Sequence, residues 1–280
     1  MNFLSQLTGS FAMPAAENPT VAIVEAAYQH HSMDWRYINC EIAPERLADA
    51  VRGARAMGWR GFNCSLPHKV AVIEHLDRLG ESAEIIGAVN CVVAKDGALI
   101  GENTDGKGFV ESLRGLVELA GAHIVVLGAG GAARAIAVES ALAEAAHLTI
   151  VNRTPARGEE LATLISDRTP ASAEFLPLAE GFQMPEAANI LVNATSVGLF
   201  PNVEETPGVD MNSLSPETLV ADVIPNPPQT RFLDIARKSG CQTVNGHGML
   251  VNQAIKGIEY WSGVKVERAA MLSVLSEIFE

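Results

Sequence analysis

The chain lacks an excess of basic residues, and this absence excludes one class of partner. Among its 280 residues, 20 Lys and Arg stand against 33 Asp and Glu, which gives a net charge of −13. No basic stripe that could follow a phosphate backbone is present, so we expect no nucleic-acid partner. Any anionic ligand must then be bound by a few local cations.

Membrane and export features are also missing from the sequence. No segment approaches the roughly 18 consecutive apolar residues that a membrane-spanning helix needs. The first residues, MNFLSQLTGS, lack the basic stretch and apolar core of a signal peptide. We therefore predict a cytoplasmic protein without a membrane partner. Its expected partner is a small-molecule substrate, and the expected state is a monomer or homodimer, which these absences do not decide.

Cysteine is scarce and scattered along the chain. The four cysteines are far apart and show neither a CxxC motif nor a metal-binding spacing with histidine. Three of them lie in strand-like runs, so we expect buried thiols in a reducing compartment and no metal site. These cysteines are Cys40, Cys64, Cys91 and Cys241.

What the sequence does contain is enough apolar material for two hydrophobic cores. A chain of 280 residues is long for one simple domain, so two domains are expected. The content of 48% hydrophobic and 19% charged residues is typical of a globular enzyme. No internal repeat or low-complexity segment is visible.

The first hundred residues alternate strand-like and helix-like segments. Apolar side chains recur with period two over residues 34–42 and with helical spacing over residues 44–58. A strand over 61–66 and a helix over 70–79 are predicted next. Two further strands meet at residues 95–97 (KDG), a sequence that favours a hairpin turn. The first strand places Ile38, Cys40 and Ile42 on one face, and the helical stripe consists of Leu47, Ala50, Val51, Ala54 and Met57.

The pattern changes at residue 123. From there to residue 154, an apolar strand, a glycine turn, an alanine-rich helix and a second apolar strand follow one another. This is the pattern of a parallel βαβ unit, whose strands lose their alternation because both faces are buried. Apolar strands at 189–193 and 219–223 extend the unit, so we predict a doubly wound sheet from about residue 107 to 246. The chain ends in two helix-like segments, 249–262 and about 267–279.

The loop LGAGGAARA, residues 127–135, indicates a dinucleotide site. It follows a strand and opens a helix inside a βαβ unit, which is the context in which such a motif binds a pyrophosphate. Gly128 permits the tight turn, Gly130 lets the backbone approach the phosphates, and Ala133 lets helix and strand pack closely. A purely structural glycine turn is the alternative.

The end of the second βαβ strand favours NADP over NAD. NAD sites use a carboxylate there to hold the ribose 2′-hydroxyl, whereas this chain has Asn152, Arg153, Thr154 and Arg157. Arginine forks match a 2′-phosphate, which a carboxylate would repel. NAD stays a weaker alternative cofactor, and capping of a surface turn is the alternative role for Arg153.

Seven motifs follow one another along nearly the whole chain: GFNCSLPHK (61–69), GAVN (87–90), GENTDGKG (101–108), GAGGAARA (128–135), NRT (152–154), NATSVG (193–198) and GHGMLVNQA (246–254). In this order they resemble the motifs of the shikimate dehydrogenase family. The resemblance implies an α/β fold with an N-terminal α/β catalytic domain (1–106 and 247–280, the C-terminal helices returning to it) and a Rossmann-type doubly wound NADP-binding domain (107–246).

The resemblance also implies roles for single residues. The paired lysine and aspartate that carry the family's chemistry correspond to Lys69 and Asp105. Reduction of a ketone by hydride leaves an alkoxide, which needs a proton from a positioned acid, and a lysine ammonium can supply it. His68 receives no role, and Asn63 a structural one. The substrate-binding positions implied are Ser65, Asn90, Asp105 and Gln253, and we add Asn18 and Thr20 as candidates to replace hydroxyl donors that the chain lacks. The cofactor-binding positions are Gly128, Ala129, Gly130, Gly131, Ala132, Ala133, Asn152, Arg153, Thr154, Arg157, Thr195, Ser196, Gly246 and Met249.

The substrate anchor departs from the family pattern. Two serines that bind the substrate carboxylate in the family correspond here to Ala16 and Asn18, or in a shifted register to Ala15 and Glu17. A family tyrosine that assists them is replaced by Pro225. A buried carboxylate that loses its hydrogen-bond donors is costly to hold, so the change indicates a paralogue with an altered substrate.

Three hypotheses for function follow. The leading one is an NADP-dependent oxidoreductase that interconverts shikimate and 3-dehydroshikimate, a step of aromatic amino acid biosynthesis in the shikimate pathway. The second keeps the chemistry but acts on quinate or another alicyclic hydroxy acid. The third is an NADP-binding regulatory paralogue with low turnover, against which the intact lysine and aspartate speak. A panel of substrates assayed with NADP and NAD distinguishes them.

Overall fold

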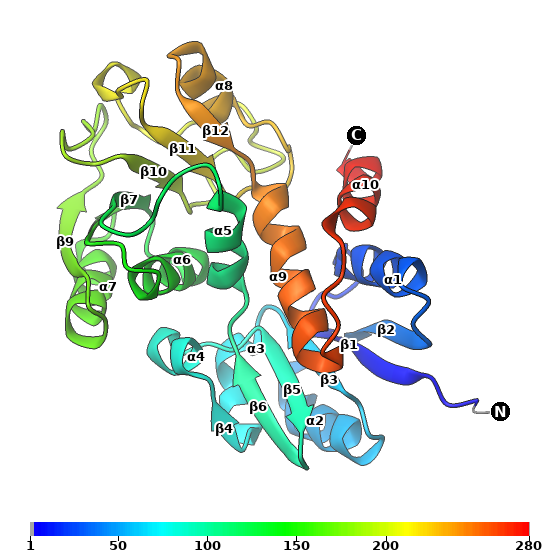
Figure 1. Cartoon of the computed structure of the whole chain (residues 1–280). Helices are drawn as coiled ribbons and strands as arrows, with labels where there is room; N and C mark the ends of the chain where they lie inside the picture. The colour runs from blue at the N-terminus through cyan, green and yellow to red at the C-terminus, as the bar shows by residue number, and fades with distance from the viewer. Residues whose placement is uncertain (1–2, 280) are drawn as a thin grey trace. The chain divides into compact units, whose positions relative to one another are not determined.

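The computed structural model describes residues 3–279 and divides into two compact units (Figure 1). Unit 1 contains the described residues up to Thr104 together with Val251–Ile278. Unit 2 contains Asp105–Leu250 and Phe279. Residues 1, 2 and 280 of the predicted catalytic domain lie outside the described residues.

Unit 1 is built on a six-stranded mixed sheet in the order β2-β1-β3-β5-β6-β4. Strand β1 pairs in parallel with β2 and β3, whereas β5 pairs antiparallel with β3 and β6. The strands are β1 Gln6–Ala12, β2 Trp35–Glu41, β3 Gly61–Cys64, β4 Arg78–Leu79, β5 Cys91–Lys95 and β6 Ala98–Glu102. The helices are α1 Thr20–His30, α2 Leu47–Ala56, α3 His68–Ala71 and α4 Glu81–Ile86, with 3-10 turns η1 Pro44–Arg46 and η2 Val72–His75.

The core of unit 1 forms where α2 meets the sheet. The buried side of α2 presents Leu47, Val51 and Ala54, three members of the predicted stripe. They pack in one cluster with Phe11 and Phe62, whose rings are stacked with centroids 4.4 Å apart. The hydrophobic side of the helix therefore faces the sheet, as its spacing predicts.

The β5–β6 hairpin confirms the turn that the sequence predicts at residues 95–97. Asp96 and Gly97 have φ values of 54° and 80°. Two consecutive residues with positive φ make the two-residue turn whose twist matches that of paired strands. The hairpin is important for the site because residues just before β5 and just after β6 carry predicted functional side chains.

Three local expectations in unit 1 hold only in part or not at all. The helix expected over 70–79 is instead α3, η2 and the short strand β4, which pairs in parallel with β6. Sheet hydrogen bonds have overridden helical spacing there, and Val70 is left 65% exposed. The strand expected over 61–66 ends at Cys64. In β2, Ile38 is 44% exposed and Tyr37 on the opposite face is buried.

Unit 2 contains a six-stranded parallel sheet in the order β12-β11-β10-β7-β8-β9. The chain runs outward from β7 to β9 and then returns to β10 on the other side of β7, so the strand order reverses there. The strands are β7 His123–Leu127, β8 His147–Asn152, β9 Ser172–Pro177, β10 Ile190–Asn193, β11 Leu219–Asp222 and β12 Gln242–Val244. The helices are α5 Asp105–Leu113, α6 Gly131–Leu142, α7 Pro155–Arg168 and α8 Arg231–Lys238, with the 3-10 turn η3 Met211–Ser213.

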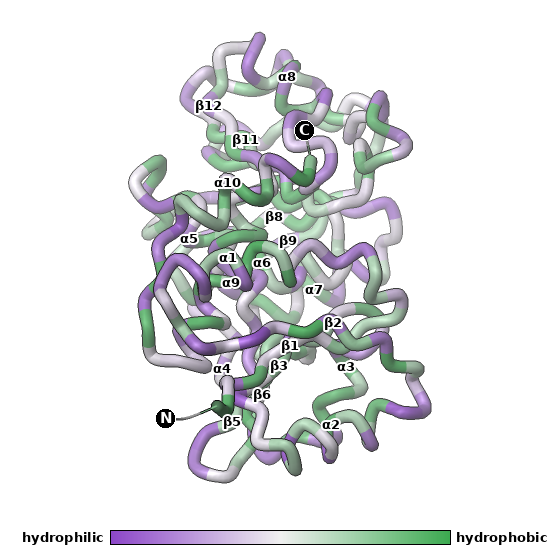
Figure 2. Tube along the Cα trace, turned by 90° about the vertical axis from the view of Figure 1, so that its right-hand side faces the viewer, coloured by the Kyte–Doolittle hydropathy of each residue, from purple (hydrophilic) through white to green (hydrophobic). Residues whose placement is uncertain are grey.

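The central strands of unit 2 are buried on both faces, as the unbroken apolar runs predict. Every residue of β10 and β11 is buried. Helices α6 and α7 pack against β7, β8 and β9 (Figure 1). The trace in Figure 2 changes repeatedly between hydrophobic and hydrophilic residues, as expected for elements with one buried face.

The chain ends in helices α9 Gly246–Ser262 and α10 Arg268–Phe279. In unit 1, Trp261 of α9 donates a 2.9 Å hydrogen bond from Nε1 to the main-chain oxygen of Val92. A side chain at Gly61 would collide with this indole, so glycine there lets the C-terminal helix pack on the sheet.

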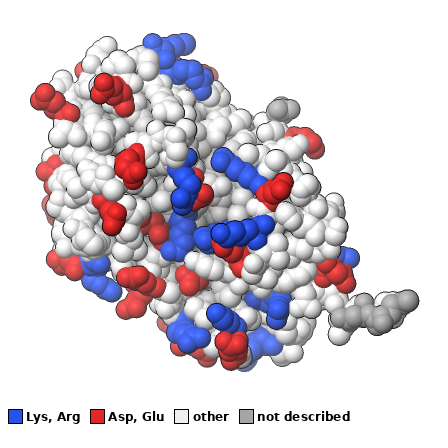
Figure 3. Space-filling view, in the orientation of Figure 1, with Lys and Arg blue, Asp and Glu red and all other residues white. Residues whose placement is uncertain are grey.

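Two surface properties complete the description. None of the described helices is long and apolar enough to cross a membrane. On the face drawn in Figure 3, acidic side chains are scattered over the surface and basic ones stand in small groups among them.

Candidate functional site

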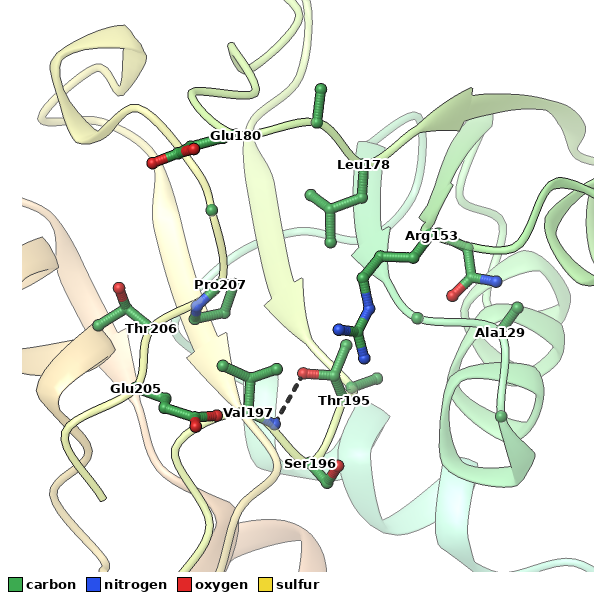
Figure 4. A pocket seen from close by; sticks show the side chains of 16 residues that line it. Ala129, Arg153, Leu178, Glu180, Thr195, Ser196, Val197, Glu205, Thr206 and Pro207 are labelled. Atoms are coloured by element: carbon green, nitrogen blue, oxygen red, sulfur yellow. Dashed lines mark hydrogen bonds between the residues drawn. The ribbon is translucent and has the colours of Figure 1, made fainter. Parts of the chain in front are cut away.

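A cavity of about 580 Å³ opens in unit 2 at the carboxyl ends of the central strands. The ends of β7 and β10 meet there, at the reversal of strand order where doubly wound sheets bind their ligands. Seven of the residues predicted to bind the cofactor line this cavity (Figure 4): Gly128, Ala129, Gly130, Asn152, Arg153, Thr195 and Ser196.

Glycine is required in the loop for two different physical reasons. Gly128 has a φ of +107°, and a Cβ there would come within 3.0 Å of the Ala194 oxygen. At Gly130 and Gly131, by contrast, a Cβ would meet no protein atom within 4 Å. These two glycines stand at the first turn of α6, whose leading N–H groups lack helical partners. Open space in front of a helix N-terminus fits a pyrophosphate.

The end of β8 presents a cation to the cavity. Arg153 follows β8 directly and extends toward Thr195 (Figure 4). The last residue of β8 is Asn152, whose Nδ2 donates to the Thr154 oxygen at 2.9 Å. No carboxylate stands at the position where an NAD site would hold the ribose, so the residues present fit a 2′-phosphate.

The sequence motifs did not indicate two of the segments that line the cavity. Residues 178–180 follow β9, and residues 205–208 belong to the long connection after β10. Neither segment carries a glycine signature, and only the position of β9 next to β8 could have indicated the first. Seven predicted cofactor residues do not line the cavity: Gly131, Ala132, Ala133, Thr154, Arg157, Gly246 and Met249.

Packing explains two of these seven residues. Ala133 is fully buried in α6, where a small side chain allows close contact with the sheet. Gly246 begins α9, and a Cβ there would come within 2.6 Å of the Val223 oxygen. Glycine at that position allows the helix start to approach the segment after β11.

A buried hydrogen-bond network holds the Thr195 loop beneath the cavity. Asn193 accepts hydrogen bonds at Oδ1 from Thr195 N and Oγ1, at 3.1 and 2.7 Å. Its Nδ2 donates to Asp222 Oδ1 at 3.1 Å, and Thr230 Oγ1 donates to Asp222 Oδ2 at 2.8 Å. Burial raises the pKa of Asp222 to about 6, although these hydrogen bonds oppose the shift.

In unit 1, main-chain pairing brings Lys69 to the β5–β6 hairpin. Lys69 lies half-buried in the short helix α3, and its main-chain oxygen accepts a hydrogen bond from Val89 N at 2.7 Å. The next residue, Asn90, is buried and its main-chain oxygen accepts from Cys64 N at 2.9 Å. The lysine therefore starts from a backbone position fixed by the sheet.

A polar cluster continues from Asn90. Its Oδ1 accepts from Thr104 N at 2.7 Å, and its Nδ2 donates to Thr104 Oγ1 at 3.0 Å. Thr104 Oγ1 also lies 3.4 Å from Gln253 Oε1 of α9. The structure thus brings together two predicted substrate-binding residues, Asn90 and Gln253, through Thr104, which the sequence motifs did not single out.

Asp105 is held by its neighbours on both sides. It follows the hydrogen-bonded Thr104 and is the first residue of α5. The next residue, Gly106, packs so closely on α6 that a Cβ would lie 2.7 Å from the carbonyl carbon of Ala135. One residue further, Lys107 Nζ pairs with Glu139 Oε1 at 2.6 Å, with both side chains largely buried. Together these contacts fix the first turn of α5.

The N-terminal segment shows what occupies the region of the missing serines. Asn18 Oδ1 accepts from Thr20 N at 3.0 Å, and Asn18 Nδ2 donates to Ser10 Oγ at 3.4 Å. Asn18 therefore accepts from the first N–H of α1 from a position just before the N-cap Pro19, and Thr20 is buried. Glu41 Oε2 accepts from Ala15 N at 3.0 Å, which adds a carboxylate beside the segment.

Two further predicted residues have clear positions. Ser65 follows β3, half-buried, and its main-chain N donates to the Phe11 oxygen at 3.0 Å. His68 is buried, and its Nε2 lies 2.8 Å from the Ile42 oxygen. This contact gives the histidine a structural place, in line with the absence of a predicted role.

Three family models match successive parts of the chain. The shikimate dehydrogenase substrate binding domain matches residues 11–92, the shikimate / quinate 5-dehydrogenase model residues 111–205, and the shikimate 5′-dehydrogenase C-terminal domain residues 246–275. Among curated proteins, a shikimate dehydrogenase (NADP(+)) of Shouchella clausii is 39% identical over 270 residues, which cover 95% of this chain and 96% of that protein.

Solved structures are similar over the full length. The ligand-free form of 5-ketofructose reductase of Gluconobacter sp. is 58% identical, with a TM-score of 0.97 and coverage of 99% of this chain and 100% of that one. Shikimate 5-dehydrogenase from Listeria monocytogenes, in complex with shikimate and NAD, is 33% identical, with a TM-score of 0.91 and coverage of 100% and 98%. These likenesses confirm the expected fold class, a catalytic domain plus a Rossmann-type domain.

Proposed function

The chain belongs to the shikimate dehydrogenase family, and we propose that within this family it reduces a neutral polyhydroxy ketone such as 5-ketofructose. The type of reaction follows from the family. The chain is an NADP-dependent oxidoreductase of the shikimate dehydrogenase type, which acts on a CH–OH group. In the direction of reduction, the carbonyl carbon gains a hydride and the carbonyl oxygen gains a proton.

Each of four residues of the chain would have its own role in binding the substrate or in proton transfer. Bound NADP supplies the hydride in its reduced form and accepts it in its oxidised form. The Lys69 ammonium would give the proton to the carbonyl oxygen as that oxygen becomes an alkoxide, and would receive it back in the reverse direction. The Asp105 carboxylate would accept a hydrogen bond from a substrate hydroxyl, and Asn90 and Gln253 would bind further hydroxyls from the polar cluster around Thr104.

The lost carboxylate anchor is the observation that carries the choice of substrate. In either register the family's hydroxyl donors are missing, at Ala16 and Asn18 or at Ala15 and Glu17, and Pro225 replaces the tyrosine, so an acid would find fewer partners. Glu41, bonded to Ala15 N, adds a negative charge beside the same segment, and like charges repel. A polyol ketone carries no charge and needs no such anchor. The 58% identical relative is a reductase of 5-ketofructose, which supports this choice.

The pair shikimate and 3-dehydroshikimate is the second candidate. The curated relatives favour it, since the protein of Shouchella clausii at 39% identity is a shikimate dehydrogenase (NADP(+)). The retained Lys69, Asn90, Asp105 and Gln253 serve that substrate equally well, because its ring hydroxyls resemble those of a polyol. Only the carboxylate end distinguishes the two candidates.

Purified protein with a panel of substrates tests the proposal. 5-Ketofructose and 3-dehydroshikimate are reduced with NADPH, shikimate and quinate are oxidised with NADP, and each assay is repeated with NADH or NAD. We expect kcat/KM for 5-ketofructose with NADPH to exceed that for 3-dehydroshikimate by at least 100-fold. A preference for 3-dehydroshikimate would reject the polyol and establish the second candidate.

We also propose that the protein works in the cytoplasm, as a monomer or a homodimer. Dependence on NADP, the cofactor of reductive metabolism, supports the location. Fractionation of cells and sedimentation velocity of the purified protein test the two statements. Recovery from a membrane or secreted fraction, or a larger assembly, would contradict them.

A further inference from the structure

Three potential metal-ligating side chains converge at the amino ends of strands β7, β8 and β9, away from the cavity. In the parallel register, His123 lies beside His147, and His147 beside Ser172. Two residues further along, Thr149 lies beside Glu174. Because residues two apart share a face of a sheet, His123, His147, Thr149 and Glu174 all project from the same face.

The side chains of this group approach one another closely. One ligand atom each from His123, His147 and Glu174 lies within 4.8 Å of the other two. His147 Nε2 is 3.5 Å from Glu174 Oε1. The two imidazole rings meet edge to face with centroids 4.5 Å apart. No other group of three such residues within the described part of the chain converges in this way.

Neighbouring hydroxyls orient the three side chains. Ser172 Oγ lies 2.7 Å from His147 Nδ1, so Nε2 is the ring nitrogen that faces Glu174. Thr149, fully buried, donates from Oγ1 to Glu174 Oε1 at 3.1 Å and contacts His123 Nε2 at 2.8 Å. Metal-binding histidines are usually held by a hydrogen bond at the nitrogen that does not bind the ion, and the Ser172 contact has this form.

We propose that His123, His147 and Glu174 bind a divalent transition-metal ion, Zn²⁺ or Ni²⁺ in the tests below. Two imidazoles and one carboxylate are a ligand set that such ions accept, with water in the remaining position. Tetrahedral bonds of about 2.0–2.2 Å place neighbouring ligand atoms about 3.3–3.6 Å apart. The His147–Glu174 separation of 3.5 Å already meets this requirement, and the ligand atom of His123, within 4.8 Å of the other two, would have to move closer when the ion binds.

The position of the site indicates what the ion would do. Glu174 is half-exposed, so an ion can arrive from solvent. Gly128 and the cavity lie at the opposite end of β7, about 17 Å away for a five-residue strand at about 3.3 Å per residue. The ion would therefore tie edge strand β9 to β7 and β8, and would stabilise unit 2 without taking part in hydride transfer.

Sequence spacing could not reveal this site. Its three ligands come from three different strands and form no short motif, so only the parallel register brings them together. The expectation of no metal rested on the absence of CxxC and of a cysteine–histidine spacing, which does not bear on ligands brought together from separate strands.

Isothermal titration of the metal-stripped full chain tests the proposal directly. Zn²⁺ or Ni²⁺ should bind the unmodified protein with one ion per chain. His147→Ala and Glu174→Gln should each weaken that binding at least tenfold, because each removes one of three protein ligands. The affinity of each variant for NADPH should stay within twofold of the original, which shows that unit 2 is folded.

A second histidine group provides the matched control. His30 and His31 on and after α1 have rings 5.1 Å apart, and Glu267 lies 3.7 Å from His30 Nε2, yet this group does not converge. His30→Ala should therefore leave metal binding unchanged. With Co²⁺, the unmodified protein and His30→Ala should show visible absorption of a low-symmetry site, and the two ligand variants should lose it. Equal binding in all four proteins, or a loss in His30→Ala alone, would overturn the proposal.

Discussion

At the residue scale, Lys69 is the side chain on which the proposed chemistry depends most. Removal of a general acid that acts in the chemical step lowers turnover without changing cofactor binding. Lys69→Ala should reduce kcat by a factor on the order of 10² or more, while the affinity for NADPH stays the same. Steady-state kinetics and fluorescence titration of NADPH measure the two quantities.

An exposed lysine of the same unit serves as the control for this experiment. Lys95 ends β5 at the hairpin turn, and Lys95→Ala should leave both kcat and the NADPH affinity unchanged. Full turnover in Lys69→Ala would show that this lysine is an ordinary surface charge.

Arg153 should decide between the two cofactors. It lines the cavity at the end of β8, where a 2′-phosphate would be placed. A hydrogen bond to a charged group contributes about 1.5–3 kcal/mol, so Arg153→Ala should weaken NADP binding at least tenfold. NAD binding should hardly change, because NAD carries no 2′-phosphate.

Arg157 is the natural comparison for Arg153. It lies outside the residues that line the cavity, so Arg157→Ala should weaken NADP less than Arg153→Ala does. Titrations of both variants with both cofactors measure this difference. An equal loss of NADP and NAD in Arg153→Ala would remove the argument for 2′-phosphate recognition.

Asp222 should make folding stability depend on pH in an unusual direction. Burial raises its pKa from 3.8 to about 6, so the folded state binds a proton at higher pH than the unfolded chain. Acidification through this range therefore stabilises the folded state, by at most about 3 kcal/mol for a shift of this size. Asp222→Asn keeps an acceptor for Asn193 and a polar partner for Thr230 but cannot titrate.

The difference in unfolding free energy between the unmodified protein and Asp222→Asn isolates this group from all others. Measured by urea denaturation between pH 7 and pH 4, the difference should shift in favour of the unmodified protein as the pH falls. A shift in favour of Asp222→Asn would mean that the folded carboxyl has a pKa below 3.8.

At the scale of elements, the contact between α5 and α6 positions Asp105. Gly106 leaves no room for a Cβ, which would lie 2.7 Å from the Ala135 carbonyl carbon. Gly106→Ala should force the helices apart and lower the free energy of unfolding by about 1–3 kcal/mol, as overpacking does. It should also reduce turnover, because the first turn of α5 carries Asp105.

A second glycine within a helix provides the control for Gly106→Ala. It tests whether the expected loss of stability comes from the contact between α5 and α6. A Cβ on Gly53 in α2 would have no atom closer than 3.9 Å. Gly53→Ala should therefore raise the free energy of unfolding by about 0.4–1 kcal/mol. Urea denaturation of both variants measures the two opposite signs. A gain in stability for Gly106→Ala would show that α5 and α6 can separate freely.

Elements with a strong local signal were predictable from the sequence. The KDG turn gave the β5–β6 hairpin, and the glycine loop with its flanking apolar runs gave β7, α6 and β8. The helix predicted over residues 70–79 is wrong because β4 pairs with β6 there. This pairing is a tertiary interaction, and helical spacing in the sequence does not indicate it. For the same reason the motifs named Asn90 and Gln253 but not Thr104, which joins them.

At the scale of the whole molecule, the proposed choice of substrate rests on positions that lie far apart in the sequence. Ala16 and Asn18 belong to unit 1, and Pro225 belongs to unit 2. Motifs identified the family from what the chain retains, whereas the proposed substrate rests on what it has lost. A lost donor leaves no pattern of its own, so the sequence could predict an altered anchor but not the molecule that it accepts.

Restoring the anchor should therefore convert the specificity. The unmodified protein should show a Michaelis constant for shikimate one to a few orders of magnitude above that of an ordinary micromolar-range enzyme, because three lost hydroxyls cost about 0.5–1.5 kcal/mol each. Ala16→Ser with Asn18→Ser should lower this constant, and a serine Oγ at position 18 can still accept from Thr20 N as Asn18 does. Adding Pro225→Tyr should lower it further, although loss of proline also changes the freedom of the loop.

Glu41→Gln provides an electrostatic counterpart to the restored hydroxyls. It removes the charge bonded to Ala15 N but keeps an acceptor oxygen, so it should lower the constant for shikimate while leaving that for neutral 5-ketofructose nearly unchanged. Turnover should change little in all these variants, since Lys69 and Asp105 remain. Initial rates with both substrates at fixed NADP or NADPH measure the effect. Micromolar affinity of the unmodified protein for shikimate would show that another group already holds the acid, and that the lost hydroxyls do not determine specificity.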